Sequence, residues 1–386
     1  MTNRWLTVGA VLAVAGCALA QNQNNPNPSS TRQPSAVSQA ASESGRQAQP
    51  FVRPDYMPRL MVGDKAPGLF IDTWVKGSPI SGLEKGKVYL VEFWATWCLP
   101  CRDSMDHLTR VQARYKDRGL TVIGISSSER NGLEDVVPFV NEMGDRMGYT
   151  VAWDDGGKTD AAWRKAAGQT GIPSAFIVDR DGFIAWVGHP AYPAGEMDEV
   201  LSQVLSNTFD LSLAADRERA GAEMMHRAQV LWSEGEYRLA LDVLGGLVTL
   251  NPKRYSSAAL QKMQGLLVQL KDTEAGYAWA NELIDTHYSN NAGVLTEIAW
   301  TILEAPGLEQ RDLSIAFRAA QRAFDLTKGE DPAALDTLAR VHFARGNTEE
   351  AFALQTRAAE LVTDERMKDL VNGRLEQYRQ AVVETK

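Results

Sequence analysis

Two cysteines that directly follow a strongly apolar segment constrain this chain more than any other feature. Residues 88–94 form a nearly unbroken apolar run with a single acid, Glu92, which is typical of a central strand covered on both faces. Cys98 and Cys101 come next, and apolar residues then recur at helical spacing from Met105 onward. The sequence therefore predicts a strand followed by a helix whose first turn carries both thiols.

The spacing of Cys98 and Cys101 suits thiol-disulfide exchange. Thiols at this spacing at a helix start can form a disulfide with little backbone movement, and the partial positive charge there favours the thiolate of Cys98. A thiolate attacks the disulfide of a client protein, and Cys101 then resolves the mixed disulfide. A zinc half-site and inert buried thiols are the alternatives. Zinc needs about four ligands, and the chain has no second cysteine pair and no histidines at ligand spacing. We therefore expect no metal and no cofactor.

Strand and helix patterns alternate on both sides of the cysteine pair, between residues 59 and 207. The expected strands span residues 88–94, 120–125, 149–153, 174–178 and 183–187, and the expected helices begin at the cysteines and span residues 133–147, 159–167 and 193–205. Residues 179–182, Asp-Arg-Asp-Gly, indicate a hairpin turn between the last two strands. This alternation predicts an α/β sheet with helices on both faces.

The motif around the cysteines resembles a known family. Residues 91–101 (VEFWATWCLPC) resemble the active site of the thioredoxin fold and, more narrowly, that of the exported TlpA/ResA-like thiol-disulfide oxidoreductases. Residues 62–67 and 86–88 resemble the N-terminal extension of that family, and residues 170–173 resemble its cis-proline loop. The resemblance implies a thioredoxin-like (redoxin) domain over residues 59–207 that exchanges disulfides with client proteins.

The resemblance also implies roles for individual residues. Cys98 would be the exposed nucleophile and Cys101 the resolving thiol. Glu92 would be a buried acid behind the pair, with a raised pKa, and would accept the proton of Cys101 through water. A carboxyl at a sheet edge or facing solvent is the alternative for Glu92.

A contact surface for the client is implied as well. Pro173, if its preceding peptide bond is cis, would place the backbone of Ile172 against Cys98, where an extended client segment would pair with it. Trp97 would lie beside the thiol as a contact surface, although a role in packing alone is the alternative.

The direction of the reaction is less constrained than its chemistry. Leu99 and Pro100, between the cysteines, match neither the proline-histidine pair of strong oxidants nor the glycine-proline pair of general reductants. The resemblance favours a reductant, and a disulfide oxidase or isomerase stays open. The segment before Cys101 lacks the Pro-x-x-x-Thr-x-x-Cys arrangement of peroxidases on this fold, so we do not expect a peroxidase.

The first 58 residues predict export. Arg4 precedes an apolar run over residues 5–15 that is followed by small residues, as in a secretory signal peptide over residues 1–20. Cleavage after Ala20 and a lipobox ending at Cys17, which would then carry a lipid anchor, both fit. Either route leads to the periplasmic or cell-envelope side, where disulfide chemistry operates. Residues 21–58, rich in Gln, Asn, Ser and Pro, predict a disordered linker.

From residue 211 the strand patterns end, and a helical repeat begins. Small residues recur at Ala240, Gly276, Ala316 and Ala351. Their intervals are close to the ~34 residues of the tetratricopeptide repeat (TPR), which this region resembles. Four helix pairs over residues 211–386, capped by a last helix over residues 364–383, would form an array whose concave face docks a protein partner. A spacer or an oligomerisation unit is the alternative.

Composition and cysteine content limit the partners. The formal net charge is -9, and no basic cluster stands out, which argues against nucleic acid as a partner. No apolar run of about 18 residues follows the leader, so the membrane would be reached only through a lipid on Cys17. The helical region has no cysteine, so a membrane or periplasmic electron donor would have to reduce the pair. A TPR-type binding adaptor with an accessory thioredoxin-like domain is the runner-up.

Overall fold

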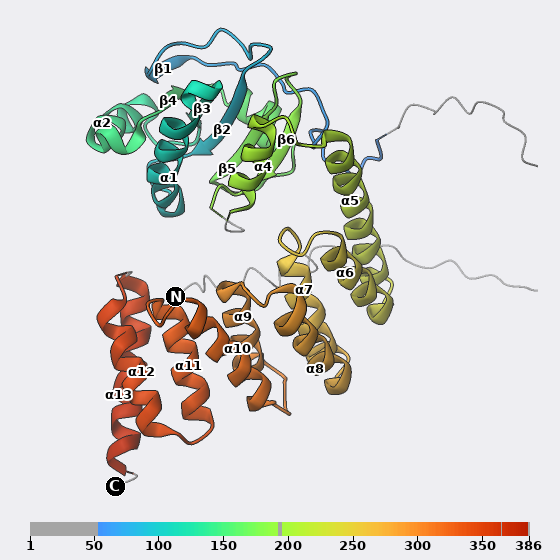
Figure 1. Ribbon diagram of the computed structural model, residues 1–386, viewed down its shortest axis with the longest axis vertical. Helices are drawn as coiled ribbons and strands as arrows, with labels where there is room; N and C mark the ends of the chain where they lie inside the picture. Colours follow the sequence, from blue (N-terminus) through green and yellow to red (C-terminus); the bar gives the residue numbers. More distant parts are fainter. Residues whose placement is uncertain (1–52, 192–194, 364, 385–386) are drawn as a thin grey trace, which may run out of the picture. The chain divides into compact units, whose positions relative to one another are not determined.

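A computed structural model describes residues 53–191, 195–363 and 365–384 of the chain (Figure 1). The predicted signal peptide, Cys17 and nearly all of the predicted linker lie outside the described residues. Within the described part of the chain, no helix is both long enough and apolar enough to cross a membrane.

The first folded region is built on a six-stranded sheet with the order β1-β4-β3-β2-β5-β6. The strands are β1 (Thr73–Lys76), β2 (Val88–Trp94), β3 (Leu120–Ser126), β4 (Thr150–Trp153), β5 (Ser174–Val178) and β6 (Ile184–Gly188). Strands β2, β3 and β4 are parallel, β5 is antiparallel to β2, and β6 is antiparallel to β5. The five predicted strands are confirmed. The edge strand β1 was not predicted, because its four residues are all half-buried and show no apolar pattern.

Helices follow the strands as predicted, with shorter bounds at several ends. They are α1 (Leu99–Tyr115), the 3-10 turn η1 (Lys116–Arg118), α2 (Leu133–Met143), the 3-10 turn η2 (Gly144–Met147), α3 (Lys158–Asp160), the π-helical turn η3 (Ala161–Lys165) and α4 (Glu196–Leu205). The helix expected over residues 159–167 is thus a single α-helical turn continued by a π-helical turn.

The alternation of side chains along β2 divides the core into two layers. Leu90 and Trp94 lie in a core formed with α1, α2 and α4, whereas Tyr89 and Phe93 pack with Trp163 of η3 and with the segment before β1. Helical elements therefore cover both faces, as expected, and β2 lies in the middle of the sheet. Glu92 shares the face of Leu90 and Trp94, which places its carboxyl under α1.

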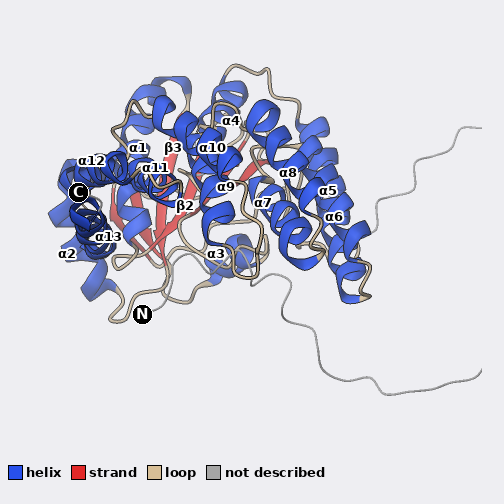
Figure 2. Ribbon diagram, turned by 90° about the horizontal axis from the view of Figure 1, so that it is seen from below, coloured by secondary structure: helices blue, strands red, loops and turns tan. Residues whose placement is uncertain are grey.

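The described chain after Gly188 contains helices and no strand (Figure 2). Beyond α4 the helices are α5 (Leu211–Ser233), α6 (Tyr237–Leu250), α7 (Ser256–Gln264) with the π-helical turn η4 (Gly265–Gln269), α8 (Thr273–Glu282) with the π-helical turn η5 (Leu283–His287), α9 (Ala292–Glu304), α10 (Leu313–Leu326), α11 (Pro332–Ala344), α12 (Thr348–Leu361) and α13 (Glu365–Glu384). Most successive helices pack against one another, and the predicted helical region is confirmed.

The recurrent small residues occupy equivalent places in this region. Ala240, Gly276, Ala316 and Ala351 lie on α6, α8, α10 and α12, the second helix of each successive pair, and all are buried. A Cβ atom at Gly276 would lie 2.5 Å from Cδ2 of Leu267 in η4. These positions thus allow close approach between neighbouring helices.

A buried polar cluster joins the last three helices. Asp336 of α11 accepts hydrogen bonds from Nη1 of Arg374 on α13 at 2.6 Å and from Nε2 of Gln355 on α12 at 2.8 Å. Gln355 also donates to the carbonyl oxygen of Val371 at 3.0 Å. The carboxyl of Asp336 therefore has both a cationic and a neutral partner inside the helical region.

Candidate active site

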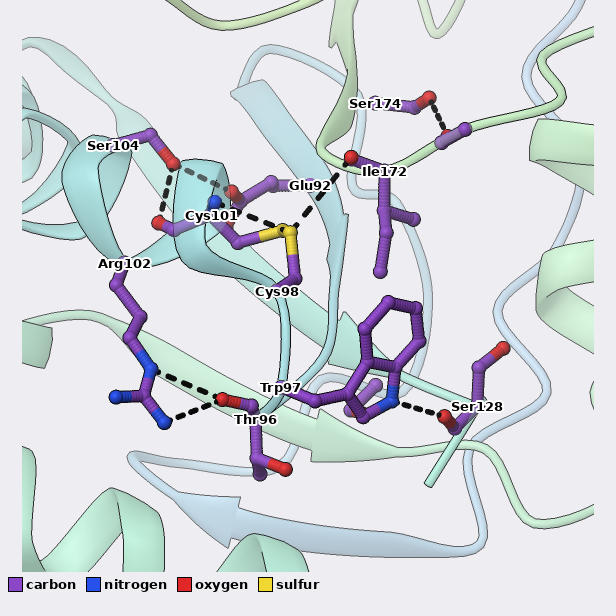
Figure 3. Close-up of a disulfide and its surroundings, with 12 residues drawn as sticks. Glu92, Thr96, Trp97, Cys98, Cys101, Arg102, Ser104, Ser128, Ile172 and Ser174 are labelled. Carbon is purple, nitrogen blue, oxygen red and sulfur yellow. Dashed lines mark hydrogen bonds between the residues drawn. A yellow bond between two sulfur atoms is a disulfide. The ribbon is translucent and has the colours of Figure 1, made fainter. Parts of the chain in front are cut away.

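The two cysteines lie where α1 begins (Figure 3). Cys98 is the N-cap residue, and its Sγ atom accepts the backbone N–H of Cys101 at 3.2 Å. Pro100 occupies the first turn, where a helix loses no hydrogen bond to a missing N–H. Cys98 and Cys101 form a disulfide with their Cα atoms 5.3 Å apart. The predicted helix start at the cysteines is confirmed, and it gives the sulfur of Cys98 a backbone N–H donor that also stabilises a thiolate.

The expectation that Cys98 is exposed is wrong for the disulfide form. Cys98 retains only 4% of its accessible surface and Cys101 none. The segment before β5 covers the pair, because the carbonyl oxygen of Ile172 lies 3.7 Å from Sγ of Cys98. A disulfide sulfur carries no proton, so this is a contact in the oxidised form and a hydrogen bond only once Cys98 is a thiol. Cys98 is nevertheless the more accessible of the two.

Antiparallel pairing of β5 with β2 brings the Ile172 segment to the cysteines. Phe93 pairs with Ser174 in this register, so the residues before Ser174 lie beside the loop after β2. The Ile172–Pro173 peptide bond is cis, in agreement with the resemblance. The hydroxyl of Ser174 donates to the carbonyl oxygen of Gly171 at 2.7 Å and closes this turn.

Apolar side chains are exposed beside the disulfide. Trp97 keeps 60% of its surface accessible and Leu99 keeps 52%. The indole Nε1 of Trp97 donates to the carbonyl oxygen of Ser128 at 2.9 Å (Figure 3), which holds the ring at the surface. Trp97 is therefore not a core residue, and its role as a contact surface for the client stays a prediction.

A carboxylate that the sequence analysis missed, Glu129, fixes the loop before Cys98. It accepts the backbone N–H of Thr96 at 2.6 Å and the hydroxyl of Thr96 at 2.8 Å. Arg102 donates from Nε and Nη2 to the carbonyl oxygen of Thr96 at 3.0 and 2.7 Å. The parallel pairing of Trp94 with Ser126 is the signal that could have found this contact, because the ends of paired parallel strands lead into adjacent loops.

Glu92 lies under the first turns of α1. Its side chain is completely buried, and its Oε1 atom accepts the hydroxyl of Ser104 at 3.0 Å. The same hydroxyl lies 2.7 Å from the carbonyl oxygen of Cys101, so Ser104 links the acid to the second cysteine (Figure 3). Because β2 is a central strand, the sheet-edge alternative for Glu92 is wrong.

Burial changes the acidity of Glu92. Loss of hydration raises the pKa of its carboxyl to about 8, and the hydrogen bond from Ser104 opposes this rise only in part. The prediction of a raised pKa is confirmed. A carboxyl with a pKa near neutrality can both take up and release a proton under ordinary conditions, as acid-base catalysis requires.

The described residues contain no group of three or more His, Cys, Asp or Glu side chains that could hold a metal ion.

The sheet, the disulfide at the start of α1 and the loop facing it together define a thioredoxin-like redox domain. Residues 62–187 match the AhpC/TSA family. Protein FixW of Rhizobium leguminosarum is 31% identical over 158 residues, which is 40% of this chain and 70% of FixW.

Two further relatives are named for their chemistry. Thiol-disulfide oxidoreductase ResA of Bacillus thuringiensis is 31% identical over 125 residues (32% of this chain and 67% of ResA). Thiol:disulfide interchange protein HelX of Rhodobacter capsulatus is 31% identical over 134 residues (34% of this chain and 69% of HelX). The chain belongs to this family of thioredoxin-like thiol-disulfide oxidoreductases. Each match covers less than half of the chain.

Proposed function

We propose that the protein reduces disulfides of exported client proteins through the Cys98–Cys101 dithiol. The observation that carries this proposal is the asymmetry of the pair. Cys98 lies at the N-terminus of α1 with a backbone N–H directed at its sulfur, whereas Cys101 is fully buried above an acid. Cys98 is then the nucleophile and Cys101 the resolving thiol.

The reaction has two displacements at sulfur. In the first, the Cys98 thiolate attacks one sulfur of the client disulfide. The client S–S bond breaks, a mixed disulfide forms, and the other client sulfur leaves as a thiolate that takes a proton from solvent. In the second, the thiolate of Cys101 attacks Sγ of Cys98, the bond between Cys98 and the client breaks, and the remaining client sulfur leaves as a thiolate that takes a proton from solvent. Two electrons pass from the dithiol to the client, and the Cys98–Cys101 disulfide is left.

Glu92 serves the second displacement. Cys101 must lose its proton before it can attack, and it is buried away from bulk water. The carboxylate of Glu92 takes this proton through water. Its pKa of about 8 lies near that of an ordinary thiol, so the proton passes between two groups of similar acidity.

The client binds over the disulfide. The exposed ring of Trp97 supplies an apolar contact, and the backbone of Ile172, held before Pro173 and beside Cys98, pairs with an extended client segment. Client residues that flank the target cysteine are therefore extended and apolar on one side.

The N-terminal segments serve export in this proposal, and the thioredoxin-like domain carries the chemistry. Residues 1–20 act as the signal peptide, with Cys17 as the lipid anchor if the lipobox route is used, and residues 21–58 form the linker. The thioredoxin-like domain then spans residues 59–207 on the periplasmic or cell-envelope side. A membrane or periplasmic donor restores the dithiol, because the helical region offers no cysteine.

The helical region, residues 211–386, docks the client or the electron donor through TPR-like repeats. Support comes from the helix pairs and from the buried small residues on α6, α8, α10 and α12. Arrays of this kind bind peptides and proteins on their concave face.

The reduction potential of the Cys98–Cys101 pair tests the direction of the reaction. Equilibration of the protein with glutathione or dithiothreitol, followed by thiol counting, gives this value. A potential near or below about -250 mV is expected for a reductant. A potential of about -120 to -180 mV would overturn the proposal in favour of a disulfide oxidase or isomerase.

A further inference from the structure

Three buried polar atoms on the Glu92 face of the sheet have no hydrogen-bond partner among the described residues. They are Oε2 of Glu92, Nε1 of Trp94 and the hydroxyl of Tyr149. All three side chains are buried. Buried polar atoms are nearly always paired, with protein or with ordered water, so three orphans on one face of the sheet call for a common partner.

Gly124 brings two of these groups together next to the third. In the parallel pairing of β2 with β3, Gly124 lies opposite Glu92. A Cβ atom at Gly124 would lie 2.9 Å from Cε2 of Tyr149 and 3.2 Å from Nε1 of Trp94. The glycine therefore lets the Tyr149 ring and the Trp94 indole meet over the strand position beside the acid.

The chemistry of the three groups is complementary around one water molecule. An indole N–H only donates, a tyrosine hydroxyl donates or accepts, and a carboxylate oxygen only accepts. A buried water typically makes about three hydrogen bonds to such groups. A water that accepts from Trp94 and Tyr149 can donate to Oε2 of Glu92, on the opposite oxygen from Ser104.

We propose that Glu92, Trp94 and Tyr149 hold an ordered water behind the disulfide, and that Tyr149 is a positioning residue for proton transfer from Cys101. The inference rests on the proposed role of Glu92. Through this water, Tyr149 stabilises the carboxylate form of Glu92, which is the form that accepts a proton. The acid then remains usable near neutral pH in spite of its burial.

The elements around Glu92 offer few other groups that could stabilise its carboxylate form. Helix α1 contributes Ser104 and Cys101, strand β3 contributes Gly124, and strand β5 contributes Ala175. Among the described residues, no charged side chain contributes to the shift of the Glu92 pKa. Burial raises the pKa of Tyr149, and the nearby charges of Glu92 and Asp106 raise it further, which favours the neutral, hydrogen-bond-donating form of its hydroxyl.

The test replaces one hydroxyl. In the oxidised full-length protein, the pKa of Glu92 is measured from the infrared band of its carboxyl group, assigned with Glu92→Gln. Tyr149→Phe is expected to raise this pKa by about half a unit or more, as loss of one hydrogen bond to a carboxylate implies. The pH profile for resolution of the mixed disulfide should shift upward by the same amount.

Tyr89 provides the matched control. It is also buried and lies on β2, but it packs in the opposite core layer, and its hydroxyl accepts the N–H of Glu84 at 2.9 Å. Tyr89→Phe should leave the pKa of Glu92 unchanged. An unchanged or lowered pKa in Tyr149→Phe, or equal shifts in the two variants, would overturn the inference.

A second variant guards against misfolding. Gly124→Ala places a methyl group into the same space and should raise the pKa of Glu92 by displacing the water. If Tyr149→Phe does not fold, an unchanged pKa in Gly124→Ala would overturn the inference. If Glu92→Gln itself leaves resolution unaffected, the proposed function of Glu92 fails. If Glu92→Gln slows resolution but Tyr149→Phe and Gly124→Ala leave the pKa of Glu92 unchanged, only the proposed water site is wrong.

Discussion

The thioredoxin-like region and the helical region each bury a carboxyl group, but the two carboxyl groups have different partners. Glu92 accepts a hydrogen bond from the neutral hydroxyl of Ser104, and burial raises its pKa to about 8. Asp336 meets the guanidinium of Arg374 and the amide of Gln355. The same chemical group is left without a counter-ion in one region and is paired in the other.

This difference indicates a chemical role for Glu92 and a structural role for Asp336. A buried acid without a cation changes its protonation near neutral pH and can exchange protons with a thiol. A buried acid that accepts hydrogen bonds from an arginine and an amide ties three helices together, and removal of the arginine destabilises the fold. The two regions should therefore respond differently to the loss of a single polar group.

The largest effect is expected for Glu92→Gln on catalysis. Gln keeps the shape of the side chain but cannot accept a proton from Cys101, so resolution of the mixed disulfide should slow about 100- to 10,000-fold. Stopped-flow measurement of client release checks this. Ser104→Ala, which keeps the acid but removes the hydroxyl that contacts Glu92 and the carbonyl oxygen of Cys101, should slow the step far less. Equal rates in Glu92→Gln and the parent chain would remove the acid from the mechanism.

Stability against pH gives the next effect. Glu92 binds its proton more tightly in the folded state than in the unfolded chain, so folding stability falls as pH rises from about 4.5 through about 8. The loss should amount to about 3–5 kcal/mol above pH 8, at 1.36 kcal/mol for each pKa unit. Urea unfolding from pH 5 to 9 should show this fall in the parent chain, with a smaller fall in Glu92→Gln. Parallel curves would contradict it.

The features on which these two predictions depend can be predicted from the sequence. An acid inside an apolar run indicates a buried carboxyl, and a Cys-x-x-Cys pair before a helical pattern indicates thiols at a helix start. The recurrence of small residues likewise predicted the helical region. Each of these signals lies within one continuous segment.

No pattern in the residues themselves predicts contacts between distant segments. Thr96 donates hydrogen bonds to Glu129, and Asp336 forms an ion pair with Arg374. Both contacts depend on how separate elements pack together. Strand β1, with four half-buried residues, shows no periodicity. The contact between Cys98 and Ile172, more than seventy residues further along the chain, was expected from the family resemblance alone, and the burial of Cys98 that results from it was not predicted.

Arg374→Ala probes the paired acid. Removing the guanidinium leaves Asp336 buried with only the amide of Gln355, so the free energy of unfolding should drop by about 2–4 kcal/mol. Arg379→Ala is the matched control on the same helix, because Arg379 forms an exposed pair with Glu376 worth under about 1 kcal/mol. Disulfide reduction should be retained by both variants. Equal losses of stability would show that Asp336 does not depend on its arginine.

The smallest effect is expected at the recurrent small residues. Ala351 is completely buried on α12, so Ala351→Leu should cost about 1–3 kcal/mol through overpacking. Ala353, on the same helix, is exposed, and Ala353→Leu should change stability by less than about 0.5 kcal/mol. Thermal unfolding followed by circular dichroism compares the pair. A tolerated leucine at Ala351 would remove the close-packing role of these positions.

Trapping of the mixed disulfide tests the central claim, that Cys98 attacks and Cys101 resolves. Cys101→Ser and Cys98→Ser forms of the full chain are each mixed, as reduced proteins, with a disulfide-containing client such as insulin. The adducts are then mapped by mass spectrometry of their peptides. We expect a stable adduct through Cys98 in Cys101→Ser and little or none through Cys101 in Cys98→Ser. Adducts that form mainly through Cys101 would contradict it.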